Sequence, residues 1–141
     1  MTQYKSPIRD IQFVLHELLG IENHYQQLLG NDEVNRELID AVIEEGAKFS
    51  ENELAPMNQS GDEEGCHWDD GVVTTPKGFK EAYDKYVEGG WPSLGGDKAF
   101  GGQGLPSSLG SVVSEMVGSA NWSWSMYPGL SQGAVATLES Q

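Results

Sequence analysis

The sequence has very little cysteine and little positive charge. Cys66 is its one cysteine among 141 residues, so no disulfide can form within the chain, and a reducing compartment, the cytoplasm, is the expected location. Eight Lys and Arg residues stand against 22 Asp and Glu residues, which gives a formal net charge of -14. Because such a surface repels phosphate groups, the composition disfavours binding to nucleic acid or to an anionic membrane.

A secretory leader and a membrane-spanning run are also missing. The opening residues, MTQYKSPIRD, have no apolar core after their charges, so no signal peptide is expected. No residue between Glu115 and Glu139 carries a formal charge, but the Ser and Gly residues, Asn121 and Pro128 make that stretch too polar for a bilayer span. A helix buried inside protein explains it better. With 38% hydrophobic and 21% charged residues, the chain has the composition of one globular domain.

Hydrophobic periodicity predicts an all-α protein, an orthogonal or up-down bundle of about five helices. They are expected between Pro7 and Gly20, between Asp32 (or Asn31) and Ala55, between Pro76 and Gly89, after Ser107 or Ser108, and after Asn121. Their expected core faces are Ile8, Ile11, Leu15, Leu18; Val34, Leu38, Val42, Phe49; Phe79, Tyr83, Tyr86, Val87; Leu109, Val112, Val113, Met116, Val117; and Trp122, Met126, Leu130, Ala134, Leu138.

Three local features refine this prediction. Gly46 lowers the stability of its helix by about 1 kcal/mol relative to alanine, so it marks a candidate point of close packing. Residues 58–75 are expected to form a loop, with a short irregular or hairpin segment around 62–75 turning at Asp70-Gly71. Because the fifth helix has no polar face, it is expected to be the central helix.

The glycine-rich segment 95–104 invites comparison with a phosphate-binding loop. It follows no predicted strand, it contains no G-x-G-x-x-G in frame, and no Gly-Lys-Ser/Thr occurs in it. A tight turn between helices, which uses the freedom of glycine at positive φ, is therefore favoured. A backbone surface that lines a pocket formed with another part of a protein is a further reading.

No catalytic or metal site is predicted. Cys66, His67, Asp69 and Asp70 match no zinc or calcium spacing, so an acidic turn beside a packed Trp68 is favoured over a metal site or a small metal-dependent hydrolase. The aromatic residues Trp122, Trp124 and Tyr127 are more typical of a core than of a cofactor site. Gly129 and Gly133 share a helix, where small residues permit either close helix packing or a slender apolar ligand.

Three ordered stretches carry a resemblance to a known family. They are Glu53-Leu54-Ala55-Pro56 followed by Asp62-Glu63; Gly90-Trp91-Pro92-Ser93-Leu94 leading to Phe100-Gly101-Gly102-Gln103-Gly104-Leu105-Pro106; and Met126-Tyr127-Pro128-Gly129-Leu130-Ser131-Gln132-Gly133-Ala134. Together they resemble the N-terminal helical domain of flavin-dependent acyl-CoA dehydrogenases. The opening residues 4–15 resemble a bacterial long-chain subgroup that includes methylmercaptopropionyl-CoA dehydrogenases.

The resemblance implies a division into domains. Residues 1–141 would form the N-terminal helical domain, with residues 1–30 as a subgroup-specific extension, and the middle β domain and C-terminal helical domain of the family are absent. The parent enzyme would bind FAD and oxidise the Cα–Cβ bond of acyl-CoA thioesters. Since the catalytic glutamate and most FAD contacts come from the later domains in the family, the 141 residues alone are expected to be inactive and to bind no flavin.

The last helix of this domain helps to wall the acyl cavity in the family. Carried over, the candidate substrate-binding residues are Tyr127, Gly129, Leu130 and Gly133, with Phe100 nearby. The uncharged last helix is also expected to promote self-association into a homo-oligomer. The alternative function is a free-standing helical module that binds a partner protein. The acceptor that reoxidises the flavin is left open.

Overall fold

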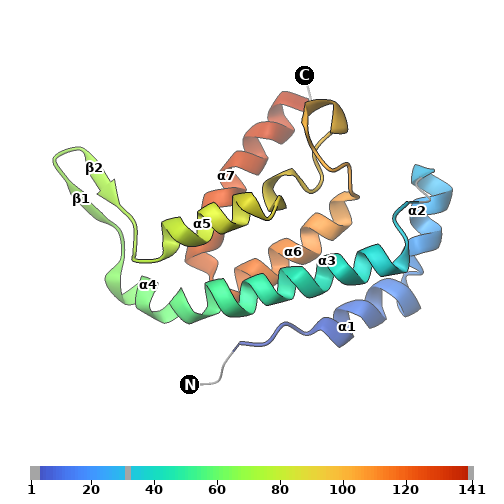
Figure 1. Ribbon diagram of the computed structural model, residues 1–141, viewed down its shortest axis with the longest axis horizontal. Coiled ribbons are helices and arrows are strands. Elements are labelled where there is room, and N and C mark those ends of the chain that lie inside the picture. Colours follow the sequence, from blue (N-terminus) through green and yellow to red (C-terminus); the bar gives the residue numbers. More distant parts are fainter. Residues whose placement is uncertain (1–3, 31–32, 140–141) are drawn as a thin grey trace.

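The computed structural model describes residues 4–30 and 33–139 (Figure 1). The chain is mostly helical, with one small hairpin. The α-helices and strands are α1 (Ile8–Gln12), α2 (Ile21–Leu29), α3 (Arg36–Phe49), α4 (Asn58–Glu64), β1 (His67–Asp69), β2 (Val72–Thr74), α5 (Phe79–Glu88), α6 (Ser107–Ala120) and α7 (Trp122–Glu139). Phe13–Leu18 and Ser50–Leu54 are π-helical, and Ala55–Met57, Trp91–Ser93 and Lys98–Phe100 are 3-10 turns.

The core lies where α3 packs against α6. Ile39 and Ile43 of α3 have no exposed surface, and neither has Leu109 of α6. A Cβ atom added to Gly46 would lie 2.9 Å from the Cε atom of Met116, so the glycine lets the two helices approach closely. The structure therefore confirms the prediction of close packing at Gly46.

The buried face of α3 differs in part from the expected one. Ile39, Ile43 and Ala47 face the core, whereas Leu38, Val42 and Phe49 are only half-buried. The cap differs too, because Asn35 accepts the N–H of Leu38 at 3.0 Å. The expected capping residues Asn31 and Asp32 lie outside the described residues. Periodicity alone located the stripe about one residue out of phase, because the partner helix selects the face.

After Phe49 the helix changes type and bends. The π-helical turn is followed by a 3-10 turn at Pro56, whose ring has no N–H to continue an α-helix. The weakening expected at Ala55-Pro56 is thus confirmed. The loop expected over 58–75 is wrong for its first part, where α4 forms, and Gly61 of α4 packs on the ring of Phe79. The expected hairpin is confirmed: β1 and β2 pair antiparallel around Asp70 and Gly71, both at positive φ.

The N-terminal segment is attached to α3 by polar contacts. His16 is enclosed, and its two ring nitrogens lie 2.6 Å from Glu22 Oε1 and 2.9 Å from Asp40 Oδ1. Leu15 is buried, but Leu18 is 68% exposed, so the core face expected for the first helix is wrong at that position. The separate helix α2, which begins after the left-handed Gly20, was not expected.

Helices α5 and α6 agree closely with the periodicity. Phe79 and Tyr86 are buried on α5, although Val87, expected in the core, is half exposed. On α6 the apolar stripe is buried as predicted, but Pro106 occupies the N-cap position that Ser107 or Ser108 was expected to fill. These features establish the all-α class predicted from the sequence.

The last helix is buried only at its beginning. Asn121 caps α7, as predicted, and Trp124 is fully enclosed. The side chains of 129–138 are all exposed, and Figure 1 shows α7 extending away from α3 and α4. The expectation of a central helix is therefore wrong for the second half of α7, because no described element packs on it.

Candidate functional site

The first turns of α7 are attached to two distant parts of the chain. Asn121 Oδ1 accepts the N–H of Trp124 at 3.0 Å, and its Nδ2 donates to the carbonyl of Leu54 at 3.3 Å. The indole N–H of Trp124 donates to the carbonyl of Phe79 at 3.0 Å. Because these groups are buried, each bond satisfies a polar atom that water cannot reach. The start of α7 is therefore fixed against both α5 and the bend after α3.

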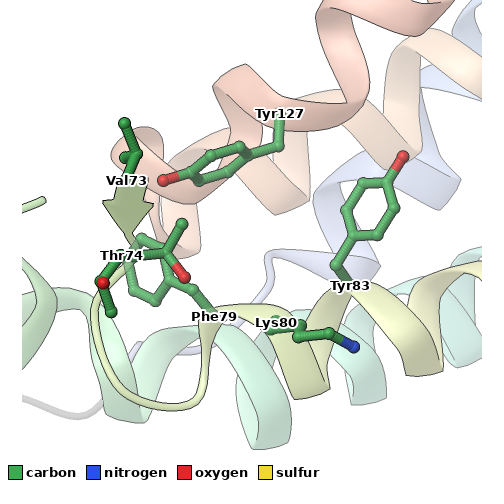
Figure 2. A pocket seen from close by; sticks show the side chains of 7 residues that line it. Val73, Thr74, Phe79, Lys80, Tyr83 and Tyr127 are labelled. Atoms are coloured by element: carbon green, nitrogen blue, oxygen red, sulfur yellow. The ribbon is translucent and has the colours of Figure 1, made fainter. Parts of the chain in front are cut away.

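A pocket of about 530 Å3 opens beside this anchored part of α7 (Figure 2). Its walls come from the end of the hairpin, the start of α5 and one residue of α7. Most of the lining is apolar or aromatic, and the charged group is an amine, Lys80, which pairs with Asp84 at 2.7 Å. The lining residues are Val73, Thr74, Thr75, Phe79, Lys80, Tyr83 and Tyr127.

Aromatic rings form one side of the pocket and are held in place from behind. The rings of Phe79 and Tyr127 meet edge to face, with centroids 6.1 Å apart. A Cβ atom on Gly61 would lie 2.6 Å from two atoms of the Phe79 ring, so only glycine leaves room for that ring. The ring of Tyr83 lies beside that of Trp124, with the ring centroids 6.2 Å apart. The pocket thus has a preformed wall, as small-molecule sites commonly have.

Tyr127 contributes a hydroxyl to this wall. Its oxygen lies 3.6 Å from the Sγ atom of Cys66, at the start of the hairpin. Burial, with the neighbouring Cys66 thiol as a lesser cause, raises the pKa of Tyr127 to about 12. The phenol is therefore neutral at physiological pH, and it can both donate and accept a hydrogen bond.

The structure does not bring the five predicted substrate residues together. Tyr127 lines the pocket, whereas Gly129 and Gly133 do not. With 3.6 residues per turn, these glycines lie about 200° and about 240° around the helix axis from Tyr127. Leu130 is 75% exposed, and Phe100 is 86% exposed at a turn outside the pocket.

The glycine face of α7 is open. A Cβ atom at Gly129 or Gly133 would meet no atom within 4 Å. Trp122 and Met126 precede these glycines on the same side, and both are largely exposed. Exposed apolar surface of this extent marks a binding surface more often than a free one. Of the three aromatic residues expected in a core, only Trp124 is fully buried.

The glycine-rich segment is a closed turn. The N–H groups of Gly102 and Phe100 donate to the carbonyl of Asp97, and the N–H of Ala99 donates to the Asp97 side chain. Three hydrogen bonds between residues further apart in the sequence close the base of the turn: the N–H groups of Gln103, Gly104 and Leu105 donate to carbonyls at 93–96. Most amides are therefore used internally, which supports the tight turn predicted. The segment does not fit the pyrophosphate of a flavin nucleotide, which needs free amides.

The part of the chain that the structure describes contains no metal centre and no membrane span. Within residues 4–30 and 33–139, no group of three or more His, Cys, Asp or Glu side chains could hold a metal ion. Among the helices the structure describes, none is both long enough and apolar enough to cross a membrane. Cys66, His67 and Asp69 are exposed on or beside the hairpin, as an acidic turn requires. The expectation that Trp68 is packed is wrong, because Trp68 is 73% exposed.

Sequence reasoning missed most of the pocket lining. Phe79 and Tyr83 were predicted to lie on the face of a helix that points into the core, and Val73 and Thr74 were predicted to lie in a loop or hairpin segment. Periodicity carries no information on which half-buried rings will border a cavity, because a gap between helices decides that. The one usable signal was the spacing of Phe79 and Tyr83, which places both rings on the same side of α5.

Comparisons with known proteins find acyl-CoA dehydrogenases that are similar to this chain. It is 36% identical over 135 residues to a 3-methylmercaptopropionyl-CoA dehydrogenase from Ruegeria pomeroyi, a match that covers 96% of this chain and 23% of that protein. It is 29% identical over 134 residues to a broad-specificity linear acyl-CoA dehydrogenase from Mycobacterium tuberculosis, covering 92% and 21%. A butyryl-CoA dehydrogenase from Syntrophomonas wolfei is 28% identical over 144 residues, covering 96% and 23%.

These relatives confirm the resemblance that the sequence motifs indicate. Over nearly its whole length, the chain is similar to acyl-CoA dehydrogenases. It spans less than a quarter of the length of the curated relatives it matches. No family model matches the chain.

Proposed function

We propose that this chain is the substrate-side domain of an FAD-dependent acyl-CoA dehydrogenase that introduces a Cα–Cβ double bond into acyl-CoA thioesters. The observation that carries the proposal is the 36% identity over 135 residues to a dehydrogenase of this kind. Residues 1–30 would be the extension typical of a long-chain subgroup. The catalytic glutamate and most flavin contacts would lie in a middle β domain and a C-terminal helical domain of the parent protein.

The proposed substrate wall is the exposed second half of α7. Leu130, Gly129 and Gly133 would border the acyl chain, with Tyr127 at one edge and Phe100 as a more distant contributor. Open space over both glycines supports this role, because a slender apolar chain needs room and apolar neighbours. Since Tyr127 faces the pocket on another side of the helix, it would act at the boundary between the two surfaces.

We further propose that the exposed apolar face of α7 is covered in the working protein. The remaining domains of the parent, or a second copy in a homo-oligomer, would supply the cover, because an apolar strip of this kind is costly in water. The lone cysteine favours the cytoplasm as the compartment. The electron acceptor of the parent enzyme is left open.

The test is the flavin spectrum and activity of the protein. We expect the 141-residue chain, mixed with FAD and desalted, to show no absorbance between about 350 and 500 nm, since the flavin contacts are proposed to lie elsewhere. The full-length protein should retain stoichiometric FAD and reduce an artificial acceptor when given acyl-CoA thioesters. A full-length protein that binds no flavin, oxidises no acyl-CoA and instead binds a partner protein through α7 would favour the interaction module.

A further inference from the structure

Asn121 is a buried polar side chain at the start of α7. It is 1% exposed, and both ends of its amide are bonded, the oxygen to the N–H of Trp124 and the nitrogen to the carbonyl of Leu54. The two partners fix the orientation of the amide, because a main-chain N–H only donates and a carbonyl only accepts. A Ser or Asp cap could supply the acceptor, but the amide also supplies a separate donor.

The carbonyl of Leu54 lies at a change of helix type. The π-helical turn ends at Leu54, and a 3-10 turn begins at Ala55. In that turn the N–H of Asn58 bonds to the carbonyl of Ala55, not to that of Leu54 as it would in a continuous α-helix. Asn121 therefore joins the start of α7 to the bend that Pro56 creates 65 residues earlier.

The rest of α7 depends on how its start is held. The side chains of 129–138 are exposed, so the direction of this half of the helix is set by how its first turns are held. Gly133 lies 12 residues beyond Asn121, about 18 Å along the axis, so a tilt of about 10° at the start displaces it by about 3 Å. The orientation set at Asn121 is thus transmitted to the proposed acyl wall.

We propose that Asn121 is a positioning residue for acyl binding: by joining α7 to Leu54, it sets the tilt of the helix that carries Leu130 and Gly133. This inference rests on the proposed function. It assigns Asn121 no contact with the substrate. Its effect is on how well the distal part of a long acyl chain fits, while the chemistry at the thioester end is unchanged.

The test compares two lost hydrogen bonds in the full-length flavoenzyme. Asn121→Ala removes both amide bonds, and Asn121→Ser keeps a capping oxygen but loses the bond to Leu54. The matched control is Tyr25→Phe, because Tyr25 is also 1% exposed and its hydroxyl bonds to Ser108 Oγ at 2.5 Å, away from α7. Melting temperature, kcat and KM over a series of acyl-chain lengths, and hydrogen exchange of each helix are measured for all proteins.

We expect both the Ala and Phe variants to melt at lower temperature. Of these two variants, Asn121→Ala alone should raise KM for long acyl chains relative to short ones, by about tenfold. The reason is that displacing α7 by a few ångströms disturbs its alignment with the acyl chain. Its kcat with the shortest substrate should stay within about twofold, and exchange should increase in α7 alone. The Ser variant should fold and shift the same profile less.

Two results would count against the proposal, and they differ. If Asn121→Ala and Asn121→Ser keep the wild-type chain-length profile and α7 exchange, as Tyr25→Phe does, Asn121 is only a structural residue and the inference is overturned. If the wild-type protein oxidises no acyl-CoA of any length, the proposed function itself fails, and the positioning role falls with it.

Discussion

Replacing Trp124 with Phe should lower the free energy of unfolding by about 2–5 kcal/mol. Trp124 has no exposed surface, and its indole N–H is bonded to the carbonyl of Phe79. Phenylalanine has no such donor, so the buried carbonyl loses its partner at a cost of about 1–3 kcal/mol. The smaller ring of phenylalanine also leaves a space beside Phe49 and Tyr86, whose ring centroids lie 5.9 and 5.4 Å from that of Trp124. This space should lower the stability by about 1–2 kcal/mol more.

The control for this prediction is Trp122→Phe on the same helix. Trp122 is 71% exposed, so its replacement should change stability by less than about 0.5 kcal/mol. Urea unfolding followed by circular dichroism at about 222 nm measures both variants without relying on tryptophan emission, and unchanged slopes would keep the comparison valid. An equal loss of stability in the two variants would refute the reasoning, because the buried Trp124 would then contribute no more to stability than the exposed Trp122.

Three further predictions concern other parts of the chain. Gly61→Ala should destabilise the protein by about 1–3 kcal/mol in the same urea assay, because its Cβ would overlap the ring of Phe79, whereas Gly129→Ala, with open space, should not destabilise it. The hydrogen bond from Lys5 lowers the pKa of Glu51 below its ordinary value of 4.5. The stability that the wild type has over Glu51→Gln should therefore be complete above pH 4.5 and decrease as the pH falls further. A stability difference that does not change with pH would contradict this prediction. In the full-length enzyme, Gly133→Leu should shorten the preferred acyl chain, and an unchanged chain-length profile would exclude that wall.

Much of the fold could be predicted because local signals were strong. The i, i+3, i+4 spacing from Leu109 to Val117 and the Asp70-Gly71 turn were both found in the structure. The cap at Asn121 was also predicted, since a short amide before an apolar run is a common helix start. Where the chain offers competing caps, as at residues 31–35, the sequence could not choose among them.

The site could be predicted only in part. Tyr127 was named as a candidate and does border a pocket, but Phe79 and Val73, which complete it, were not. Tyr127, Gly129 and Gly133 were grouped because the last helix helps to wall the acyl cavity in the family that the chain resembles. The helix turns them to different sides. Whether all of them serve one substrate stays a prediction.

The sequence by itself determined the helical class, the acidic surface, the hairpin turn and the family, because each depends on residue types at short spacing or on ordered motifs. Tertiary structure alone decided which face of α3 is buried, that α4 forms where a loop was expected, and that half of α7 is left open. Those outcomes depend on which elements meet. Gly46 lets Met116 of α6 lie close to α3, and Leu54 is joined to Asn121 across 67 residues. Such contacts are selected by packing, which periodicity along one segment does not encode.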